Sequence, residues 1–449
     1  MDTFFKFQER GTTLKTEILA GVVTFMTMAY IIFVNPGILS AAFGDAGAEW
    51  IPALATATAL GATLMCLAMG LIANRPLALA SGMGLNAVVA FSIILGAGVP
   101  WQVGMAVVFV EGIVILLLVM TGLRKAIMNA IPINLKRAIG VGIGLFITFI
   151  GLVDGGLVTA NPATLVQLGD FSNPAVWVTL IGLVAIFAFM ALKVKGDILL
   201  GILVAAAAAL IFGVTELPKE IVATPDFRTF FAPFQQVDGK MALLHLFTPT
   251  LLLFVFAVML TDFFDTMGTV LSVGEQAGFV DEDGMVPGIR NILAVDSIAA
   301  AVGGLFGASS ITTYIESAAG VAEGGRTGLT SVVTGLLFAL TVFFTPVIAM
   351  IGGSTSITAG ALIVVGFLMM TNIKEIPWTD FENAFPAFLV IVGIPLTYNI
   401  SYGIGLGFIT FVLIKLLHGK AREIHWLMYI TSVLFVIAFV LPSIQAAIG

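Results

Sequence analysis

Two short stretches decide the fold of this chain: RPLALASGMGLNAVVAF at residues 75–91 and GASSITTYIESAAGVAEGG at residues 307–325. Each opens with small residues that favour no helix, at 80–84 and 307–312, and continues as a short helix. Irregular backbone at membrane depth survives only where it is packed in protein or lines a cavity. We therefore expect two broken helices whose free N–H groups and positive dipole ends face a cavity. The alternative for either stretch alone is that its glycines only allow close helix packing.

The composition around these stretches is that of a membrane protein. Of the 449 residues, 59% are hydrophobic and 10% are charged, against about 25% charged in soluble domains. The mean hydropathy of +1.12 agrees. These values exclude a soluble enzyme, a disordered chain and a disulfide scaffold, and the lone Cys66 can form no internal disulfide. The polar N-terminus predicts no cleavable signal peptide, and nucleic acid is not an expected partner.

Apolar segments long enough, or nearly long enough, to cross a bilayer of about 30 Å recur along the chain. A polar stretch at 215–240 separates two sets of seven, so we expect about fourteen transmembrane segments. The first set covers 17–35, 51–73, 77–95, 101–121, 138–153, 174–192 and 197–213. The second covers 245–271, 291–306, 309–323, 328–351, 357–372, 384–400 and 402–418, and a further segment lies at 425–446.

The basic residues give the expected orientation. Threading the spans in order places sixteen of the 19 Lys and Arg on the side of the N-terminus, which predicts a cytoplasmic N-terminus. The three others, Lys219, Arg228 and Lys240, share the long loop. The C-terminal topology stays open: 384–418 either crosses twice or forms one broken span, which makes 425–446 an extra segment or the fourteenth.

An odd number of spans in each half means that the second half inserts inverted relative to the first. The two interrupted stretches are then the third and tenth spans, each the third of its half. Inverted repeats of this kind place a binding site near the midplane, between discontinuous helices. We expect the site backbone to include Gly82, Gly84, Ser310 and Thr312.

Carboxylates inside the membrane are costly and mark candidate functional sites. Asp262 and Asp265 lie three apart on one face of the eighth span, in MLTDFFDTMGTVLS. Glu316 lies in the short tenth helix, and Asn86 holds the corresponding place in the third. We expect these four side chains to share one central pocket. Because Asp262 and Asp265 are offset by about 60° around the helix, we expect Asp262 to face the ligand and Asp265 to carry a proton.

Other polar residues are expected to be structural. Asp296 precedes Ser297 near the start of the ninth span, which is typical of an N-terminal cap. Glu111 stands among apolar neighbours with no obvious partner and is expected to be protonated. Asn35 and Asn161 lie at a span end and in a loop, where we expect them to cap. No histidine lies at membrane depth, so any protons must move on carboxylates.

Several motifs resemble the AzgA-like branch of nucleobase–cation symporters, the guanine/hypoxanthine and adenine permeases. They are TFMTMAYIIFVNP (24–36), SGMGLNA (81–87), MNAIPINLKRAIGVGIGLFITF (128–149), TDFFDTMGT (261–269) and YIESAAGVAEGGRTGLT (314–330). The resemblance implies purine binding at Asn86, Asp262 and Glu316, with Asp265 tied to coupling. It also implies a core domain (1–123 and 245–352) and a gate domain (124–244 and 353–449) that can form a homodimer.

The sequence thus predicts a secondary active transporter that imports purine nucleobases by proton symport through alternating access. We expect it in the plasma (bacterial inner) membrane, with no enzymatic activity, no metal and no cofactor beyond the coupling proton. Na⁺ coupling is an alternative, because Asp265, Thr266 and Thr269 offer oxygen ligands. An anion exchanger of the same fold type is a second alternative, and it is disfavoured because no Lys or Arg is expected at membrane depth.

Overall fold

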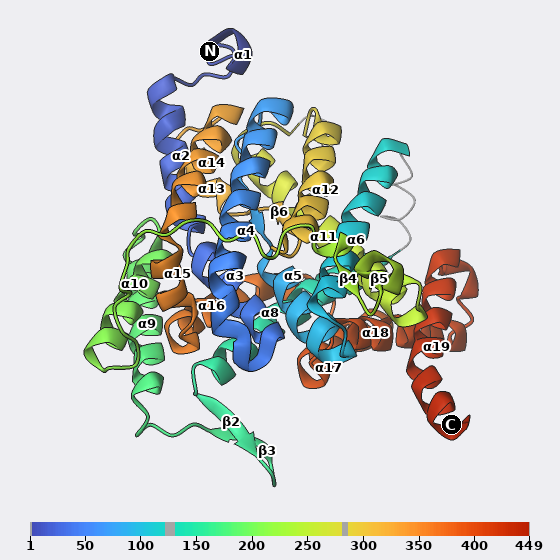
Figure 1. Ribbon diagram of the computed structural model, residues 1–449. Coiled ribbons are helices and arrows are strands. Elements are labelled where there is room, and N and C mark those ends of the chain that lie inside the picture. Colours follow the sequence, from blue (N-terminus) through green and yellow to red (C-terminus); the bar gives the residue numbers. More distant parts are fainter. Residues whose placement is uncertain (1, 122–130, 281–285, 449) are drawn as a thin grey trace.

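The computed structural model describes residues 2–121, 131–280 and 286–448, and helices dominate it throughout (Figure 1). Within these residues, nine helical runs are long and apolar enough to cross a membrane, and four shorter apolar helices accompany them. The chain is therefore a multi-span helical membrane protein. The boundary expected at 123/124 lies outside the described residues.

The helices of the first half are α1 (Asp2–Phe5), α2 (Leu14–Met28), α3 (Ile31–Ser40), α4 (Gly47–Ala68), α5 (Met83–Ala87), α6 (Trp101–Thr121), α8 (Ile133–Asp154), α9 (Pro174–Ala191) and α10 (Asp197–Ile211). The second half contains α11 (Pro249–Gln276), α12 (Ile289–Phe306), α13 (Ser317–Ala322), α14 (Gly328–Thr341), α15 (Thr345–Gly352), α16 (Thr355–Met369), α17 (Phe381–Thr397), α18 (Ile400–Leu417) and α19 (Trp426–Ile448). Wider π-type turns extend α4 over Met69–Ala73 and α5 over Val88–Leu95.

Side chains of the expected type fix many of the helix starts. Thr13, Asn173, Thr248 and Asn399 each accept a backbone N–H bond from the first turn of the helix that follows. A long-range contact fixes the start of α14, where the buried Glu17 of α2 accepts hydrogen bonds from the N–H groups of residues 326, 327 and 330. Glu17 therefore ties the first helix of one half to the second half.

Two predicted spans differ in the structure. The segment 17–35 is divided into α2 and α3 at Ala29–Tyr30, a break that its continuous hydrophobicity conceals. The segment 384–418 is two helices, α17 and α18, packed along each other as a hairpin. Tyr398, in the left-handed conformation with φ 51°, and Asn399 form the turn between them. The chain thus turns back at residues 398–399, and the number of membrane crossings made by 384–418 stays a prediction.

Short strands also qualify the expected all-helical fold. β1 (Leu79–Ser81) pairs antiparallel with β6 (Ile311–Thr313), with Ala80 opposite Thr312. Two further ribbons, β2 (Val158–Asn161) with β3 (Leu165–Leu168) and β4 (Gln236–Val237) with β5 (Lys240–Met241), lie in connecting loops. The β1–β6 ribbon joins the two interrupted stretches of the sequence, because each stretch satisfies in the other the backbone groups that no helix satisfies.

The interrupted stretches are broken where the sequence predicted, with one shift. Gly84 lies inside α5 and not in the extended stretch, whereas β6 reaches Thr313. Backbone bonds from Gly82 N–H to Ser310 O (2.9 Å) and from Tyr314 N–H to Ala78 O (2.9 Å) extend the ribbon at both ends. Its buried position requires these bonds, since an unpaired backbone group at membrane depth is costly.

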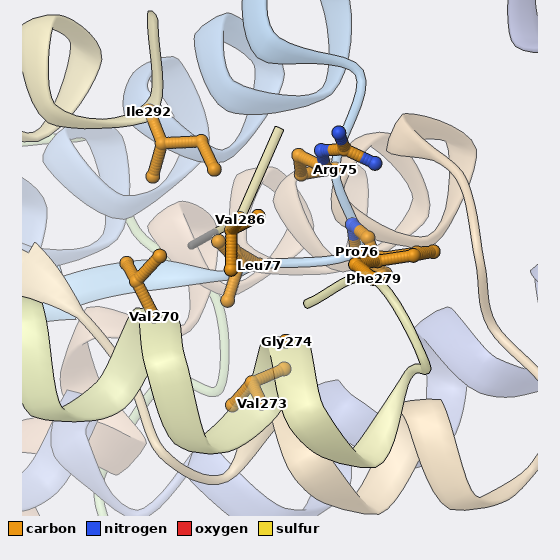
Figure 2. Close-up of a pocket in the computed structure, with 9 residues that line it drawn as sticks. All are labelled: Arg75, Pro76, Leu77, Val270, Val273, Gly274, Phe279, Val286 and Ile292. Atoms are coloured by element: carbon orange, nitrogen blue, oxygen red, sulfur yellow. The ribbon is translucent and has the colours of Figure 1, made fainter. Parts of the chain in front are cut away.

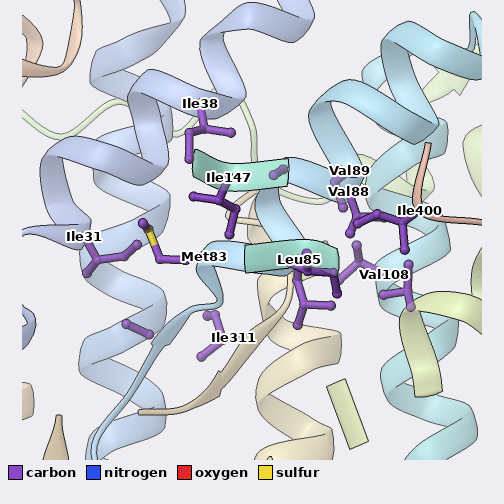
Figure 3. Packing of buried hydrophobic residues seen from close by; sticks show 14 of the residues in the cluster. Ile31, Ile38, Met83, Leu85, Val88, Val89, Val108, Ile147, Ile311 and Ile400 are labelled. Atoms are coloured by element: carbon purple, nitrogen blue, oxygen red, sulfur yellow. The ribbon is translucent and has the colours of Figure 1, made fainter. Parts of the chain in front are cut away.

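The ribbon and α5 are held in the largest apolar cluster of the protein. Figure 3 shows Met83 and Leu85 of α5 among side chains from other elements, including Ile31 of α3, Val108 of α6 and Ile400 of α18. Many large apolar side chains, such as Leu117, Val184 and Leu340, are instead exposed on the outside. A surface of this kind suits contact with lipid.

Glycines allow α6 and α12 to approach closely. A Cβ on Gly112 of α6 would lie 2.4 Å from Ala301 N, and one on Gly304 of α12 would lie 2.5 Å from Phe109 N. Side chains at either position would push the helices apart. This contact positions residue 111 against the interior of the protein.

Candidate functional site

The β1–β6 ribbon supplies the backbone of the candidate site, as the sequence predicted for the interrupted stretches. Gly82, Ser310 and Thr312 all belong to it or to its ends, and all are buried. The hydroxyl of Tyr314 donates to Ser81 O at 2.5 Å and ties the two strands together from the side. Gly84 follows in α5, where a Cβ would lie 2.8 Å from the Ile143 side chain of α8.

Two of the predicted site carboxylates lie close to each other and are not fully buried. Asp265 of α11 is exposed, and Glu316, which immediately precedes α13 and is not inside it, is partly buried. The two carboxylates are near enough to interact electrostatically. The hydroxyl of the buried Tyr30, at the break between α2 and α3, donates to Glu316 Oε1 at 2.6 Å. We call Asp265 and Glu316 the accessible acids.

The accessible surface continues along α11 towards its C-terminal end. Asp265, Gly268, Ser272 and Glu275 are exposed at helical spacing, whereas residues 257–263 of the same helix are buried. Three of these four residues are polar, which is unexpected for a face in contact with lipid. Asp265 thus shares an exposed stripe of α11 with Ser272 and Glu275, towards the end of the helix that leads to residue 276.

Three further carboxylates are fully or almost fully buried behind the ribbon, on three different helices. They are Glu111 of α6 (0% exposed), Asp262 of α11 (0%) and Asp296 of α12 (3%). We call them the buried acids. The predicted pair Asp262 and Asp265 is thus divided between the two groups, because the offset of about 60° around the helix leaves Asp262 buried and Asp265 exposed.

Asp296 is not the helix cap that the sequence suggested. α12 begins at Ile289, a full two turns earlier, so Asp296 lies inside the helix. Its carboxylate accepts hydrogen bonds from the Thr266 hydroxyl (2.6 Å), the Thr313 N–H (2.8 Å) and the Thr312 hydroxyl (3.4 Å). Asp296 therefore fastens β6 to α11 and α12.

Glu111 and Asp262 form a pair, although the sequence suggested no partner for Glu111. The two carboxyl groups interact with each other inside the protein. Ser310 donates to Asp262 Oδ2 at 3.4 Å. Asp262 Oδ1 and both Glu111 oxygens receive no N–H or hydroxyl bond from the described residues.

Asn86 is held by an amide that was expected only to cap a span end. Its Nδ2 donates to Asn35 Oδ1 at 2.9 Å, and Asn35 in turn donates to Thr58 Oγ1 (2.7 Å) and Ala308 O (3.1 Å). Asn86 Oδ1 is buried and has no donor among the described residues. Asn35 thus joins the third span to the segment before β6. Asn161 does cap a turn, since its Oδ1 accepts the N–H groups of Ala163 and Thr164.

A small cavity lies near the same end of α11, and its lining differs from that of the acid site (Figure 2). Its lining is apolar apart from Arg75: Pro76, Leu77, Val270, Val273, Gly274, Phe279, Val286 and Ile292. Arg75 stacks over the Phe279 ring at 4.6 Å and donates to Pro287 O. None of the five membrane carboxylates lines this cavity.

Sequence reasoning missed Tyr30, Asn35, Thr266 and the roles of Glu111 and Asp296. Each lies on a helix different from the residues that it binds, so no local spacing could reveal the contact. The available signal was the cost of a carboxylate at membrane depth, which singled out Glu111 and Asp296, although we expected both to be structural.

A bundle of membrane helices with two broken ones, paired as a ribbon beside polar side chains, is the architecture of a membrane permease. The Xan_ur_permease model, described as "Permease family", matches residues 15–406, and the chain belongs to this family. Permeases are transporters, so the chain is not an enzyme.

Relatives of known name agree over almost the full length. The guanine/hypoxanthine permease PbuG of Bacillus subtilis is 42% identical over 98% of this chain and 99% of its own. The adenine permease AdeP of Escherichia coli is 39% identical over 98% of this chain and 96% of its own. The resemblance seen in the motifs is confirmed.

Solved structures support the fold. The transmembrane domain of the cyanobacterial bicarbonate transporter BicA has a TM-score of 0.64 at 16% identity, covering 87% of this chain and 97% of that domain. The SLC26A9 structure has a TM-score of 0.59 at 12% identity, covering 90% of this chain and 66% of that one. At these identities the likeness concerns the fold alone.

Proposed function

We propose that this chain imports purine nucleobases by proton symport. The observation that carries the proposal is the pair of accessible acids, fixed beside a mid-chain ribbon in a protein whose relatives are named guanine/hypoxanthine and adenine permeases. Carboxylates accept hydrogen bonds from N–H groups, and a purine edge presents several such groups. Buried polar groups left unpaired cost about 1–3 kcal/mol each, so a site matched to this edge rejects bases of another shape.

We assign base recognition to Glu316 together with Asp265, and we place Asn86 and Asp262 behind them. The predicted base contacts were Asn86, Asp262 and Glu316, with Asp265 for the proton. Accessibility supports a different division: Asp265 is exposed and Glu316 is partly buried, whereas Asp262 is fully buried and faces Glu111. Asn86 keeps an unpartnered Oδ1 that can accept from a base lying against α5.

We propose alternating access between a core (1–123 and 245–352) and a gate (124–244 and 353–449), with a homodimer formed through the gate. The exposed stripe on α11 supports an open path towards its C-terminal end. With the N-terminus in the cytoplasm of a bacterial inner membrane, that path leads inward. Lys136 of α8, stacked over the Phe264 ring at 4.4 Å, lies where the proposed gate meets the core.

The two alternative couplings have weaker support. A Na⁺ site made of Asp265, Thr266 and Thr269 needs their oxygens to converge. The Thr266 hydroxyl instead bonds to Asp296 and lies 2.8 Å from the Thr312 hydroxyl. An anion exchanger would have to place its ligand beside Asp265 and Glu316, two acids whose negative charge repels it.

Uptake by proteoliposomes tests the proposal. Radiolabelled hypoxanthine, guanine and adenine are offered with an inward pH gradient, with and without Na⁺, and unlabelled uracil serves as the competitor. We expect purine accumulation that follows the pH gradient, is indifferent to Na⁺ and resists uracil. Glu316→Gln and Asp265→Asn should raise the concentration needed for half-maximal uptake by roughly 10- to 100-fold, the value of one charged hydrogen bond. Uptake of uracil without competition by purines would refute the substrate assignment.

A further inference from the structure

We infer that the Glu111–Asp262 pair is the proton-carrying site of this transporter, separate from the accessible acids. The inference rests on the proposed proton symport and deepens it by naming the carrier. The sequence suggested no partner for Glu111, and the structure brings it to Asp262.

The Glu111–Asp262 pair has few hydrogen-bond donors around it. Both Glu111 oxygens and Asp262 Oδ1 are buried and receive no N–H or hydroxyl hydrogen bond from the described residues. The two carboxyl groups nevertheless interact with each other. Carboxylates are acceptors only, so a favourable contact between the two requires a proton on one of them. Two adjacent carboxylates in apolar surroundings also cannot both be charged. The pair therefore holds at least one proton.

The surroundings separate the pair from the other acids. Asp296, a third buried carboxylate, already receives three hydrogen-bond donors. Glu316 has the Tyr30 hydroxyl, and Asp265 is exposed. Among these carboxyl groups in the described residues, Glu111 Oε1, Glu111 Oε2 and Asp262 Oδ1 are the buried oxygens that no donor reaches, and a proton is the ligand that can complete them.

Other charged groups on the elements packed around the pair are engaged elsewhere or lie at their ends. Lys136 of α8 stacks over Phe264, and Arg290 in the first turn of α12 donates to Met120 O. His245, before α11, bonds to Val237 O. No Lys, Arg or His among the described residues forms an ion pair with Glu111, Asp262 or Asp296, so a proton is the available counter-charge.

The pair can exist in two states that differ by one proton. In the first, a single shared proton leaves a net charge of −1, and in the second both carboxyls are protonated and the pair is neutral. Loading takes up one proton, release returns it, and no other bond changes. Because Ser310 donates to Asp262 and β6 runs from residue 311 to Thr313, three residues before Glu316, one strand connects the proton site with the accessible acids.

The test separates coupled accumulation from exchange. Wild-type protein and the variants Glu111→Gln, Glu111→Asp and Glu216→Gln are reconstituted, and two rates are measured with radiolabelled hypoxanthine: pH-gradient-driven accumulation and counterflow at equal pH. Glu216 is an exposed loop residue and is the matched control for the same isosteric change. A gradient of one pH unit supports roughly tenfold accumulation for one proton.

We expect Glu111→Gln to keep counterflow within about threefold of wild type and to lose accumulation above equilibrium. Glu111→Asp, which retains a carboxyl, should keep part of the accumulation, and Glu216→Gln should match wild type. Accumulation by Glu111→Gln overturns the inference, and so does the loss of counterflow together with accumulation, which indicates a structural role. If wild-type protein itself accumulates no hypoxanthine under a pH gradient, the proposed function fails, and the variants are not needed to show it.

Discussion

Replacing Tyr30 with Phe tests whether the accessible acids depend on a fixed geometry. The Tyr30 hydroxyl donates to Glu316 Oε1 at 2.6 Å, a short distance typical of a hydrogen bond to a charged acceptor. Tyr30 is 1% exposed, so water cannot easily replace the missing hydroxyl in the variant. Glu316 then either takes up a proton or turns away, and both outcomes remove the acceptor that we propose for the base.

A hydrogen bond to a charged group contributes about 1.5–3 kcal/mol, which predicts a rise of roughly 10- to 150-fold in the Kd for purine. Binding of radiolabelled hypoxanthine to detergent-solubilised protein measures it. Tyr402→Phe, at a tyrosine 44% exposed on α18, is the control. In the double variant, adding Tyr30→Phe to Glu316→Gln should raise the Kd little beyond the value for Glu316→Gln alone. A Kd for Tyr30→Phe equal to that of the control, or full additivity with Glu316→Gln, would refute the reasoning.

Three further predictions concern the framework. Glu17→Gln replaces a buried acceptor of N–H groups at the start of α14. Losing these charged hydrogen bonds should lower the free energy of unfolding by about 3 kcal/mol, and the melting temperature should fall clearly. Glu9→Gln, in the exposed Lys6–Glu9 pair, should change it little. Gly112→Val should separate α6 from α12 and abolish transport, whereas Gly140→Ala, with open space around it, should be tolerated. Lys195→Ala breaks an exposed ion pair with Glu323 (3.0 Å) and should change stability by less than about 1 kcal/mol in thermal unfolding.

The sequence was most informative where an apolar membrane segment is interrupted by residues that do not favour a helix. Small residues at 80–84 and 307–312 interrupt apolar segments, and this was enough to predict two broken helices. It was not enough to predict that they pair as strands, because the partners are far apart in the chain and only the folded protein shows that each completes the other.

The candidate site shows the same division between local and long-range information. A carboxylate at membrane depth is visible in the sequence, so all five were found. Their partners were not, because the contact of Glu111 with Asp262 depends on how α6 packs against α11 and α12. The helical offset between Asp262 and Asp265 was predictable, but which face is buried depends on neighbouring helices that periodicity does not identify. For Asp296, the true start of α12 at Ile289 removed the basis for a cap.

The β1–β6 ribbon has a consequence for how this protein is made. About 230 residues separate the paired strands, and a ribosome adding 5–20 residues per second needs roughly ten to fifty seconds to synthesise that length. During this interval the backbone of β1 has no partner strand, and bare lipid is a costly place for its N–H and C=O groups. The third segment must therefore wait in a wet or protein-lined setting until the tenth emerges. Membrane integration of this protein is consequently completed late, by a segment from the second half of the chain.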